Sequence, residues 1–341
     1  MRERRGPTID DVAARAGVSA STVSRVLNGK TDVSAVTRTR VQAVMHELAF
    51  APTLTARRLA SGQVRTLSLL FPGGAAAISS FGLEMVFSVA RTVARHGYTC
   101  SLVADRVDEQ GLLDLFRSGA ADGVILMLVE WDDERVRVLQ EHDLPFVGIG
   151  RTRSPEAMSY VDIDEEGVVE QLVDYLVTLG HRRIGFVARS GTAVGASVRL
   201  RQGFDSAAVR HGLDAAPVVE STLDPVRAGR AVLDLLERDA DLTAFVTTHW
   251  GVGAGVLSAL AEAGRRVPQD VSVVGIAPAA MADATVPSLT GASYPADELG
   301  QRATDILVGQ LRQRAAGRRP EPERSLVLPG ITIRRSAGPP A

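Results

Sequence analysis

Two short helical patterns separated by a single glycine stand near the start of the chain. Residues 8–11 have the form of a capping box with Asp in place of Glu, and apolar residues then recur at helical spacing up to residue 16. Gly17 can adopt the left-handed conformation that ends a helix tightly, and Ser19 is placed to cap a second helix. This order of helix, sharp turn and helix predicts a helix-turn-helix unit.

The predicted second helix has one apolar side and one side of small and polar residues. Val23, Val26 and Leu27 face inward, which leaves Arg25 and its small neighbours outward. Small side chains let a helix enter the major groove, and Arg25 can make the paired contacts that a guanine edge offers. A third helix that opens at Ser34 completes a small core. A helical bundle without DNA function is the alternative, and the polar outward face with its arginine disfavours it.

The net charge of −2 conceals an asymmetry. Residues 1–62 contain ten Arg or Lys and five Asp or Glu, which gives this segment a charge of +5 and leaves −7 for the remainder. A basic head suits a polyanionic partner, because contacts with phosphates release counterions, while an acidic body opposes nonspecific adhesion.

The pattern changes at residue 64 to short apolar runs that alternate with amphipathic stretches. Because helical segments separate the runs, they predict parallel sheets built from βαβ units, and the length suits two sheets. The expected strands are residues 66–71, 98–104, 123–128, 145–149, 184–188, 218–220, 244–248 and 271–276.

Residues 9–19 and 22–28 closely resemble the signature of the lactose-repressor (LacI) family, and residues 161–186 are similar to the family's crossing between two lobes. The resemblance covers about residues 8–335. It implies an all-α helix-turn-helix head and an α/β two-lobed, periplasmic-binding-protein-like (type I) body with parallel sheets. The function it implies is a sequence-specific transcriptional regulator, expected to be a repressor. Its partners would be palindromic double-stranded DNA, a second copy or more of the chain, and a small-molecule effector of unknown identity.

The family's organisation implies the following boundaries in this chain. The head is expected at residues 1–51, a hinge at 52–62 and the effector-binding and dimerisation domain at 63–341. Within that domain we expect one lobe at 63–161 and 280–295, and the other at 162–279 and 296–335. Effector binding in the cleft between the lobes would control DNA affinity.

The resemblance also implies three kinds of DNA contact. Bases would be read in the major groove by Ala20, Ser21 and Arg25. Phosphates would be held by Thr8, Ser19, Thr22, Ser24, Asn28, Ser34 and Thr37. A hinge helix would enter the minor groove through Thr53, which replaces the usual Asn, and through Ala56, Arg57 and a wedging Leu59.

The expected cleft departs from sugar-binding members of the family. Ala277 stands where those members have Asp, His249 and Trp250 replace an Asn-Asp pair, and Gly150 replaces an acid, which disfavours a common sugar. Leu200 stands where an arginine is expected, although arginines flank it, so the register stays open. An aromatic, planar or anionic effector suits the candidate residues better; the alternative is that they are packing residues, a loop histidine and surface arginines. These candidates are Phe81, Trp131, Arg199, Arg201, His249 and Trp250.

The sequence contains no catalytic constellation, so we expect neither an enzyme nor a cofactor. Glycines 251, 253 and 255 are too close together for a dinucleotide fingerprint and favour helix packing instead. Asp162 and Asp164 would alternate faces on a strand and are expected to cap the next helix. Two rival classes remain. A transport solute-binding protein would need an export signal and no basic head, and an α/β enzyme with an accessory head would need a nucleophile or cofactor motif.

Location follows from what the sequence lacks. Residues 1–7 are polar, without the apolar region of a secretory signal, and no apolar run approaches the roughly 18 residues of a membrane span. We therefore expect a cytoplasmic protein. The single cysteine, Cys100, lies in an apolar run, where a small buried hydrophobic side chain is the natural interpretation.

Overall fold

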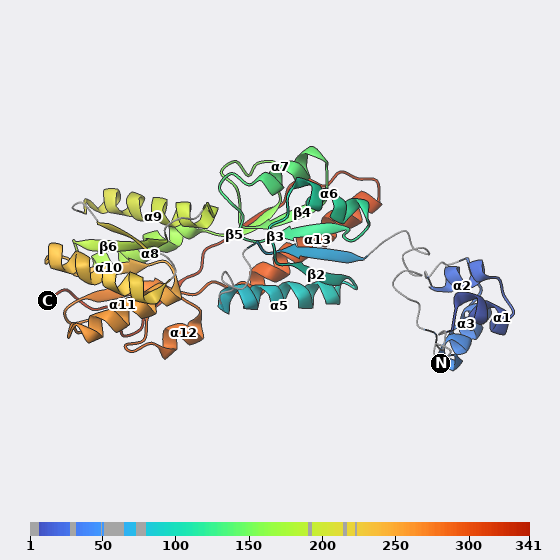
Figure 1. Cartoon of the computed structure of the whole chain (residues 1–341), viewed down its shortest axis with the longest axis horizontal. Coiled ribbons are helices and arrows are strands. Elements are labelled where there is room, and N and C mark those ends of the chain that lie inside the picture. Colours follow the sequence, from blue (N-terminus) through green and yellow to red (C-terminus); the bar gives the residue numbers. More distant parts are fainter. Residues whose placement is uncertain are drawn as a thin grey trace. The chain divides into compact units, whose positions relative to one another are not determined.

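The computed structural model describes residues 7–27, 32–48, 50, 65–72, 80–189, 193–213, 217–221 and 224–341 (Figure 1). These residues form two compact units. The first contains the described residues up to Thr66 together with Asp114–Asp122, and the second contains those of Leu67–Leu113 and Gly123–Ala341.

The head contains three helices, α1 (Ile9–Ala16), α2 (Ala20–Leu27) and α3 (Ala35–Glu47). The capping box at α1 is confirmed: the Asp11 amide donates to the Thr8 hydroxyl, and the Thr8 amide donates to the Asp11 carboxylate. Gly17 ends α1 with φ at 64°, the left-handed value expected there. The sequence pattern therefore sets the turn between α1 and α2.

The core of the head is small and aliphatic. Val12, Val23 and Val41 are completely buried, one from each helix, and Val26 packs beside them. Phe50, which the sequence analysis did not include, adds an aromatic ring to this cluster. Burial of Val23 and Val26 fixes which side of α2 faces the core and so which side faces outward.

The first lobe of the body is built on a six-stranded sheet in the order β11-β5-β4-β3-β1-β2. Strands β1, β3, β4, β5 and β11 pair in parallel. The strands are β1 (Thr66–Leu70), β2 (Thr99–Val103), β3 (Gly123–Leu126), β4 (Phe146–Ile149), β5 (Tyr160–Ile163) and β11 (Arg324–Val327). Their helices are α5 (Ser80–Arg95), α6 (Glu109–Arg117), α7 (Glu134–Glu141) and α13 (Ala296–Ala315).

The second lobe repeats this plan with the order β12-β10-β9-β8-β6-β7, in which only the β12–β10 pairing is antiparallel among the described pairs. Its strands are β6 (Ile184–Arg189), β7 (Val218–Ser221), β8 (Ala244–Thr247), β9 (Ser272–Ile276), β10 (Thr290–Ala292) and β12 (Ile331–Thr332). Its helices are α8 (Glu165–Thr178), α9 (Gly195–His211), α10 (Pro225–Arg238), α11 (Trp250–Glu262) and α12 (Ala279–Ala284), with α8 packed on α9 and α10 on α11 (Figure 1).

All eight predicted strands form, but the predicted assignment of the C-terminal segments to the lobes is wrong. Helix α13 packs on α5, and β11 extends the first sheet beside β5, so most of 296–335 belongs to the first lobe. Residues 280–295 belong to the second lobe, because β10 pairs with β9. The path of the chain in space, and not the pattern within these segments, decides which sheet they join.

Of the three glycines of α11, Gly255 serves helix packing, as predicted, whereas a Cβ on Gly251 would meet nothing closer than 3.5 Å. A Cβ on Gly255 would lie 2.1 Å from the carbonyl oxygen of Pro225 on α10, so only glycine permits the two backbones to approach this closely. Asp164 caps α8, also as predicted, whereas Asp162 lies on β5 and caps nothing. Cys100 is half-buried against the core, and burial raises the pKa of its thiol. Among the described helices none is long and apolar enough to cross a membrane.

Candidate functional site

The outward face of α2 carries the residues predicted to read bases. Ser21 and Arg25 lie one helical turn apart and are both exposed, and 61% of the Arg25 side chain is accessible. Ala20 is half-buried beside them. Arg25 lies 3.5 Å from Asp32, which is itself exposed. Exposed pairs of this kind are weak, so the guanidinium can exchange Asp32 for another partner.

Hydroxyl groups gather at the N-terminal end of α2. Ser19 accepts a hydrogen bond from the Thr22 amide at 3.2 Å and shares hydrogen bonds with the hydroxyls of Ser21 and Thr22 at 2.8 and 2.9 Å. No acidic residue lies in the first turn of α2. The positive end of the helix dipole is therefore not neutralised locally, an arrangement that favours phosphate.

Helix α3 begins in the same way. Ser34 accepts from the Thr37 amide at 3.2 Å and donates to the Thr37 hydroxyl, and the first turn again has no acid. Thr8 differs, because its hydroxyl donates to Asp11 at 2.7 Å at the start of an acidic turn. Its hydrogen bonds lower the pKa of Asp11. The structure thus gives Thr8 a capping role beside a carboxylate, which disfavours a nearby phosphate.

Of the remaining residues predicted to contact DNA, the structure describes only Ser24. Ser24 is half-buried on α2. Asn28 and the hinge residues Thr53, Ala56, Arg57 and Leu59 lie outside the described residues.

In the body, three of the predicted effector residues line one narrow cavity of about 80 Å³. Phe81 comes from α5 of the first lobe, whereas His249 and Trp250 come from the start of α11 in the second. His249 caps α11 by accepting from the Gly251 amide at 3.2 Å. The other described lining residues are Thr248, Ile276, Ala277, Pro278 and Tyr294.

Tyr294 is a lining residue that the sequence analysis missed. Its ring meets that of Phe81 edge to face, with centroids 5.6 Å apart. Its hydroxyl is buried and has no hydrogen-bond partner among the described residues. The residue follows the three-residue strand β10, which was not predicted, so no sequence signal placed it in the cleft.

The other predicted effector residues lie elsewhere. Arg199 is buried on α9 and does not line the cavity; Trp131 lies over its guanidinium at 5.6 Å from carbon to ring centroid. Arg201, two residues further along α9, is half exposed and pairs with Asp205 at 2.8 Å. Positions two apart on a helix face different directions, so only one of the two arginines can point inward. The prediction of Arg201 as a cleft residue is therefore wrong in this structure.

Arg199 belongs to a buried cluster of four charged residues. Its Nε donates to Glu165 and its Nη2 to Asp162, both at 3.2 Å. Arg151, which follows β4, donates to the same Asp162 oxygen at 2.8 Å. Burial and the neighbouring Asp162 carboxylate raise the pKa of Glu165 to about 8. Two guanidinium groups and two carboxyl groups thus satisfy one another where the first lobe passes into the second.

Backbone hydrogen bonds also join the two lobes near this cluster. The Trp131 amide donates to the Ala193 carbonyl at 2.7 Å, and the Gly195 amide donates to the Val129 carbonyl at 3.0 Å. These bonds pair the loop after β3 with the segment before α9. Any opening of the lobes along this side must break them.

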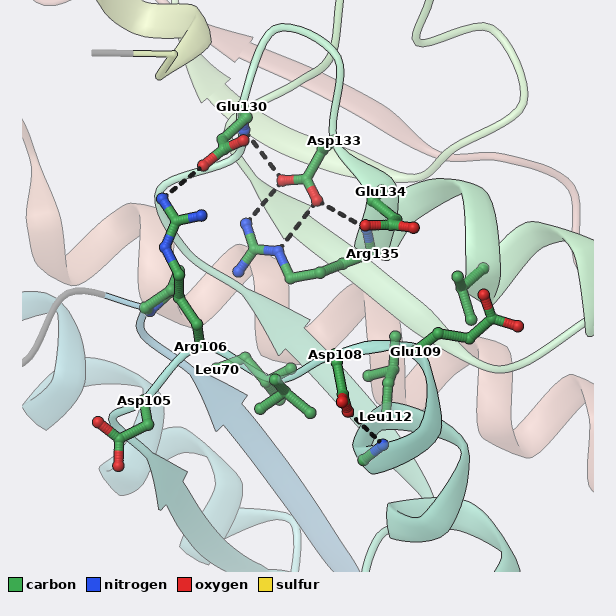
Figure 2. Close-up of a pocket in the computed structure, with 14 residues that line it drawn as sticks. Leu70, Asp105, Arg106, Asp108, Glu109, Leu112, Glu130, Asp133, Glu134 and Arg135 are labelled. Atoms are coloured by element: carbon green, nitrogen blue, oxygen red, sulfur yellow. Dashed lines mark hydrogen bonds and ion pairs between the residues drawn. The ribbon is translucent and has the colours of Figure 1, made fainter. Parts of the chain in front are cut away.

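A larger hollow of about 560 Å³ lies in the first lobe at the carboxyl ends of β1, β2 and β3 (Figure 2). Parallel sheets bind ligands at such a position, where neighbouring connections run in opposite directions. Figure 2 shows the Asp133 carboxylate facing the Arg135 guanidinium, with 2.6 Å between Oδ2 and Nη2, and Arg106 reaching Glu130. Asp133 also caps α7. Most of the acidic groups that line this hollow therefore have structural partners. No cluster of described residues could hold a metal ion.

Comparison with known proteins identifies both parts of the chain. Residues 8–53 match the model for bacterial regulatory proteins of the lacI family, and residues 173–337 match a periplasmic binding protein-like domain. The HTH-type transcriptional regulator CelR of Thermobifida fusca is 32% identical over 344 residues, which cover 98% of this chain and all of the relative. The ribose operon repressor of Escherichia coli K12 is 30% identical over 320 residues, 90% of this chain and 93% of the relative.

Solved structures agree with these relatives. A CelR–cellobiose complex has a TM-score of 0.72 at 30% identity and covers 97% of this chain and 99% of its own. A lac repressor dimer bound to operator and the anti-inducer ONPF has a TM-score of 0.84 at 22% identity and covers 98% and 100%; this second likeness concerns the fold alone. Because a relative at this identity spans the whole chain, the chain belongs to the lacI family of bacterial regulatory proteins, which are DNA-binding transcription regulators and not enzymes.

Proposed function

We propose that this chain is a cytoplasmic repressor that binds a palindromic operator as a homodimer or higher oligomer, with a small-molecule effector in the interlobe cleft controlling its DNA affinity. The observation that carries the proposal is the outward face of α2, where Ser21 and the exposed guanidinium of Arg25 extend from a helix fixed by its buried valines. A two-fold symmetric pair of such heads reads an inverted repeat.

The proposed DNA contacts fall into three groups. Ala20, Ser21 and Arg25 read bases. Thr53, Ala56, Arg57 and Leu59 would form the minor-groove hinge. The hydroxyl clusters at the starts of α2 and α3 favour phosphate binding, with Thr8 as the weakest member of the set because it neighbours Asp11. The proposed phosphate contacts are Thr8, Ser19, Thr22, Ser24, Asn28, Ser34 and Thr37.

Exposed apolar side chains on the first lobe support dimerisation through a second copy of this chain. On α5, 67% of Phe87 and 46% of Leu83 are exposed, and 52% of Leu102 is exposed on the adjacent edge strand β2. Large apolar groups gathered on neighbouring elements are typical of an interface. The lac repressor of similar fold is described as a dimer on its operator.

For the effector we propose the cleft between the lobes, with Phe81, His249 and Trp250 in the wall and with Arg199 and Trp131 in the adjoining cluster. Arg201 is not part of this proposal. Ligand binding would bias the lobes toward one arrangement and thereby change whether two heads reach the operator together.

An electrophoretic mobility shift with fragments of the source genome tests the proposal. A regulator should retard a small subset of fragments, and the retarded subset should share an inverted repeat. A transport protein or an enzyme would retard none. Uniform retardation of all fragments, lost on raising the salt concentration, would indicate nonspecific binding and contradict the proposal.

A further inference from the structure

We infer that the cleft takes an uncharged, largely apolar end of its effector and that the Tyr294 hydroxyl is the hydrogen-bonding group that selects it. The inference rests on the proposed effector-binding function of this cleft, and it adds the chemical class of the ligand and the residue that recognises it. Three features carry it: the occupied arginines, the apolar wall and the unpartnered hydroxyl.

The arginines beside the cleft are already occupied. Arg199 donates to Asp162, to Glu165 and to the Arg151 carbonyl oxygen, each at 3.2 Å. Arg151 donates to Asp162 and to the Ile163 carbonyl oxygen. An anionic ligand would have to displace an internal carboxylate from a site where only 3% of the Arg199 side chain is exposed. This argues against an anionic effector, since breaking a buried pair leaves an uncompensated charge.

The described wall of the cavity offers little to a polyol. Phe81, Trp250, Ile276, Ala277 and Pro278 present rings and aliphatic groups. The polar side chains of Thr248 and His249 also line the cavity, but each is engaged with backbone: the Thr248 hydroxyl donates to the Val187 carbonyl and His249 Nδ1 accepts from the Gly251 amide, both at 3.2 Å. A sugar needs several hydrogen-bonding partners for its hydroxyls, and buried polar groups without partners are costly. At about 80 Å³ the cavity is well below the roughly 300 Å³ of a complete ligand site, so it receives one end of a molecule.

Tyr294 adds a further polar side chain to this largely apolar wall. Its hydroxyl is buried without a partner among the described residues, and such groups in proteins nearly always have one. The edge-to-face contact with Phe81 holds the ring in place. Burial and the charges of Glu165 and Asp162 raise the pKa of Tyr294 well above its ordinary value, so the hydroxyl keeps its proton. It can therefore donate to a carbonyl or ether oxygen of an uncharged ligand.

Benzamide and benzoate form a matched pair of probes, because they share size and ring and differ in charge. Saturation-transfer NMR with the full-length protein in the absence of DNA should detect benzamide, with benzoate and cellobiose giving no signal at the same concentration. Tyr294→Phe should weaken benzamide binding by about 3- to 10-fold, the effect of removing one hydrogen bond. Tyr175→Phe, which changes a tyrosine on α8 away from the cavity, should leave it unchanged.

The inference would be overturned if benzoate or cellobiose bound at least as well as benzamide, if benzamide failed to bind up to its solubility limit, or if Tyr294→Phe kept the affinity of the unaltered protein. Circular dichroism and thermal unfolding of Tyr294→Phe establish that the variant is folded before its affinity is measured. Because no DNA is present, failure here is distinguishable from failure of operator binding, which the mobility shift measures separately.

Discussion

Arg25→Ala should lower affinity for the operator by about 5- to 150-fold, which corresponds to the loss of one paired contact with a base. Affinity for random duplex DNA should fall much less, because phosphate contacts, and not base contacts, supply nonspecific binding. The head should remain folded, since 61% of the side chain is exposed and its partner Asp32 is exposed as well. Fluorescence anisotropy on both duplexes at one fixed salt concentration measures the two affinities.

Arg15→Ala is the matched control for this experiment. It removes the same charge from the same head, but Arg15 is the last-turn basic residue of α1 and pairs with Glu47 of α3. Arg15→Ala should therefore lower the affinity for both duplexes slightly and about equally. Equal losses on operator and random DNA for Arg25→Ala as well would show that Arg25 acts only through its charge, and direct reading of bases by α2 would be excluded.

Arg199→Ala should reduce the free energy of unfolding of the body by about 3–5 kcal/mol at pH 8, because it leaves buried carboxyl groups without their partner. Arg201→Ala, two residues away, removes only an exposed pair with Asp205 and should change the free energy of unfolding by less than about 1 kcal/mol. Urea unfolding followed by circular dichroism compares the two variants. Similar losses for both would contradict the assignment of Arg199 as the buried arginine.

The loss caused by Arg199→Ala should also grow with pH. The folded protein holds the Glu165 proton with a pKa of about 8, above the ordinary 4.5, so the stability that this group contributes is greatest below pH 4.5 and is lost as the pH rises toward 8. Removing the guanidinium raises this pKa further. Arg199→Ala should therefore be less damaging at pH 5 than at pH 8, and a pH-independent loss would mean that the carboxyl groups do not titrate as a buried set.

The fold of the head could be predicted from its sequence because the patterns that determine it are local. The capping box at Thr8, the glycine at Gly17 and the valines of α2 each act within one or two helical turns. The same is true of the eight strands with apolar runs long enough to stand out. For these elements local preference and burial agree, so sequence spacing alone determines which side of α2 faces outward.

The cleft was harder because its residues are brought together by the topology. Tyr294 follows a three-residue strand, and α13 returns to the first lobe in a way that no periodicity reveals. The sequence does not distinguish Arg199 from Arg201 as the inward-facing arginine. Only the packing of α9 decides that Arg199 faces Asp162. Residue type and spacing therefore identified Phe81, His249 and Trp250 as neighbours of a cavity, but not the partners of the arginines.

Selection from a random pool of duplexes, with the bound fraction sequenced, tests the central claim most directly. If α2 of two chains reads DNA about a dyad, the bound fraction should be enriched in one inverted repeat, with a defined centre-to-centre spacing of its half-sites. The enrichment should be lost with Arg25→Ala and kept with Arg15→Ala. A pool that stays random after binding by the unaltered protein at low salt would contradict the account.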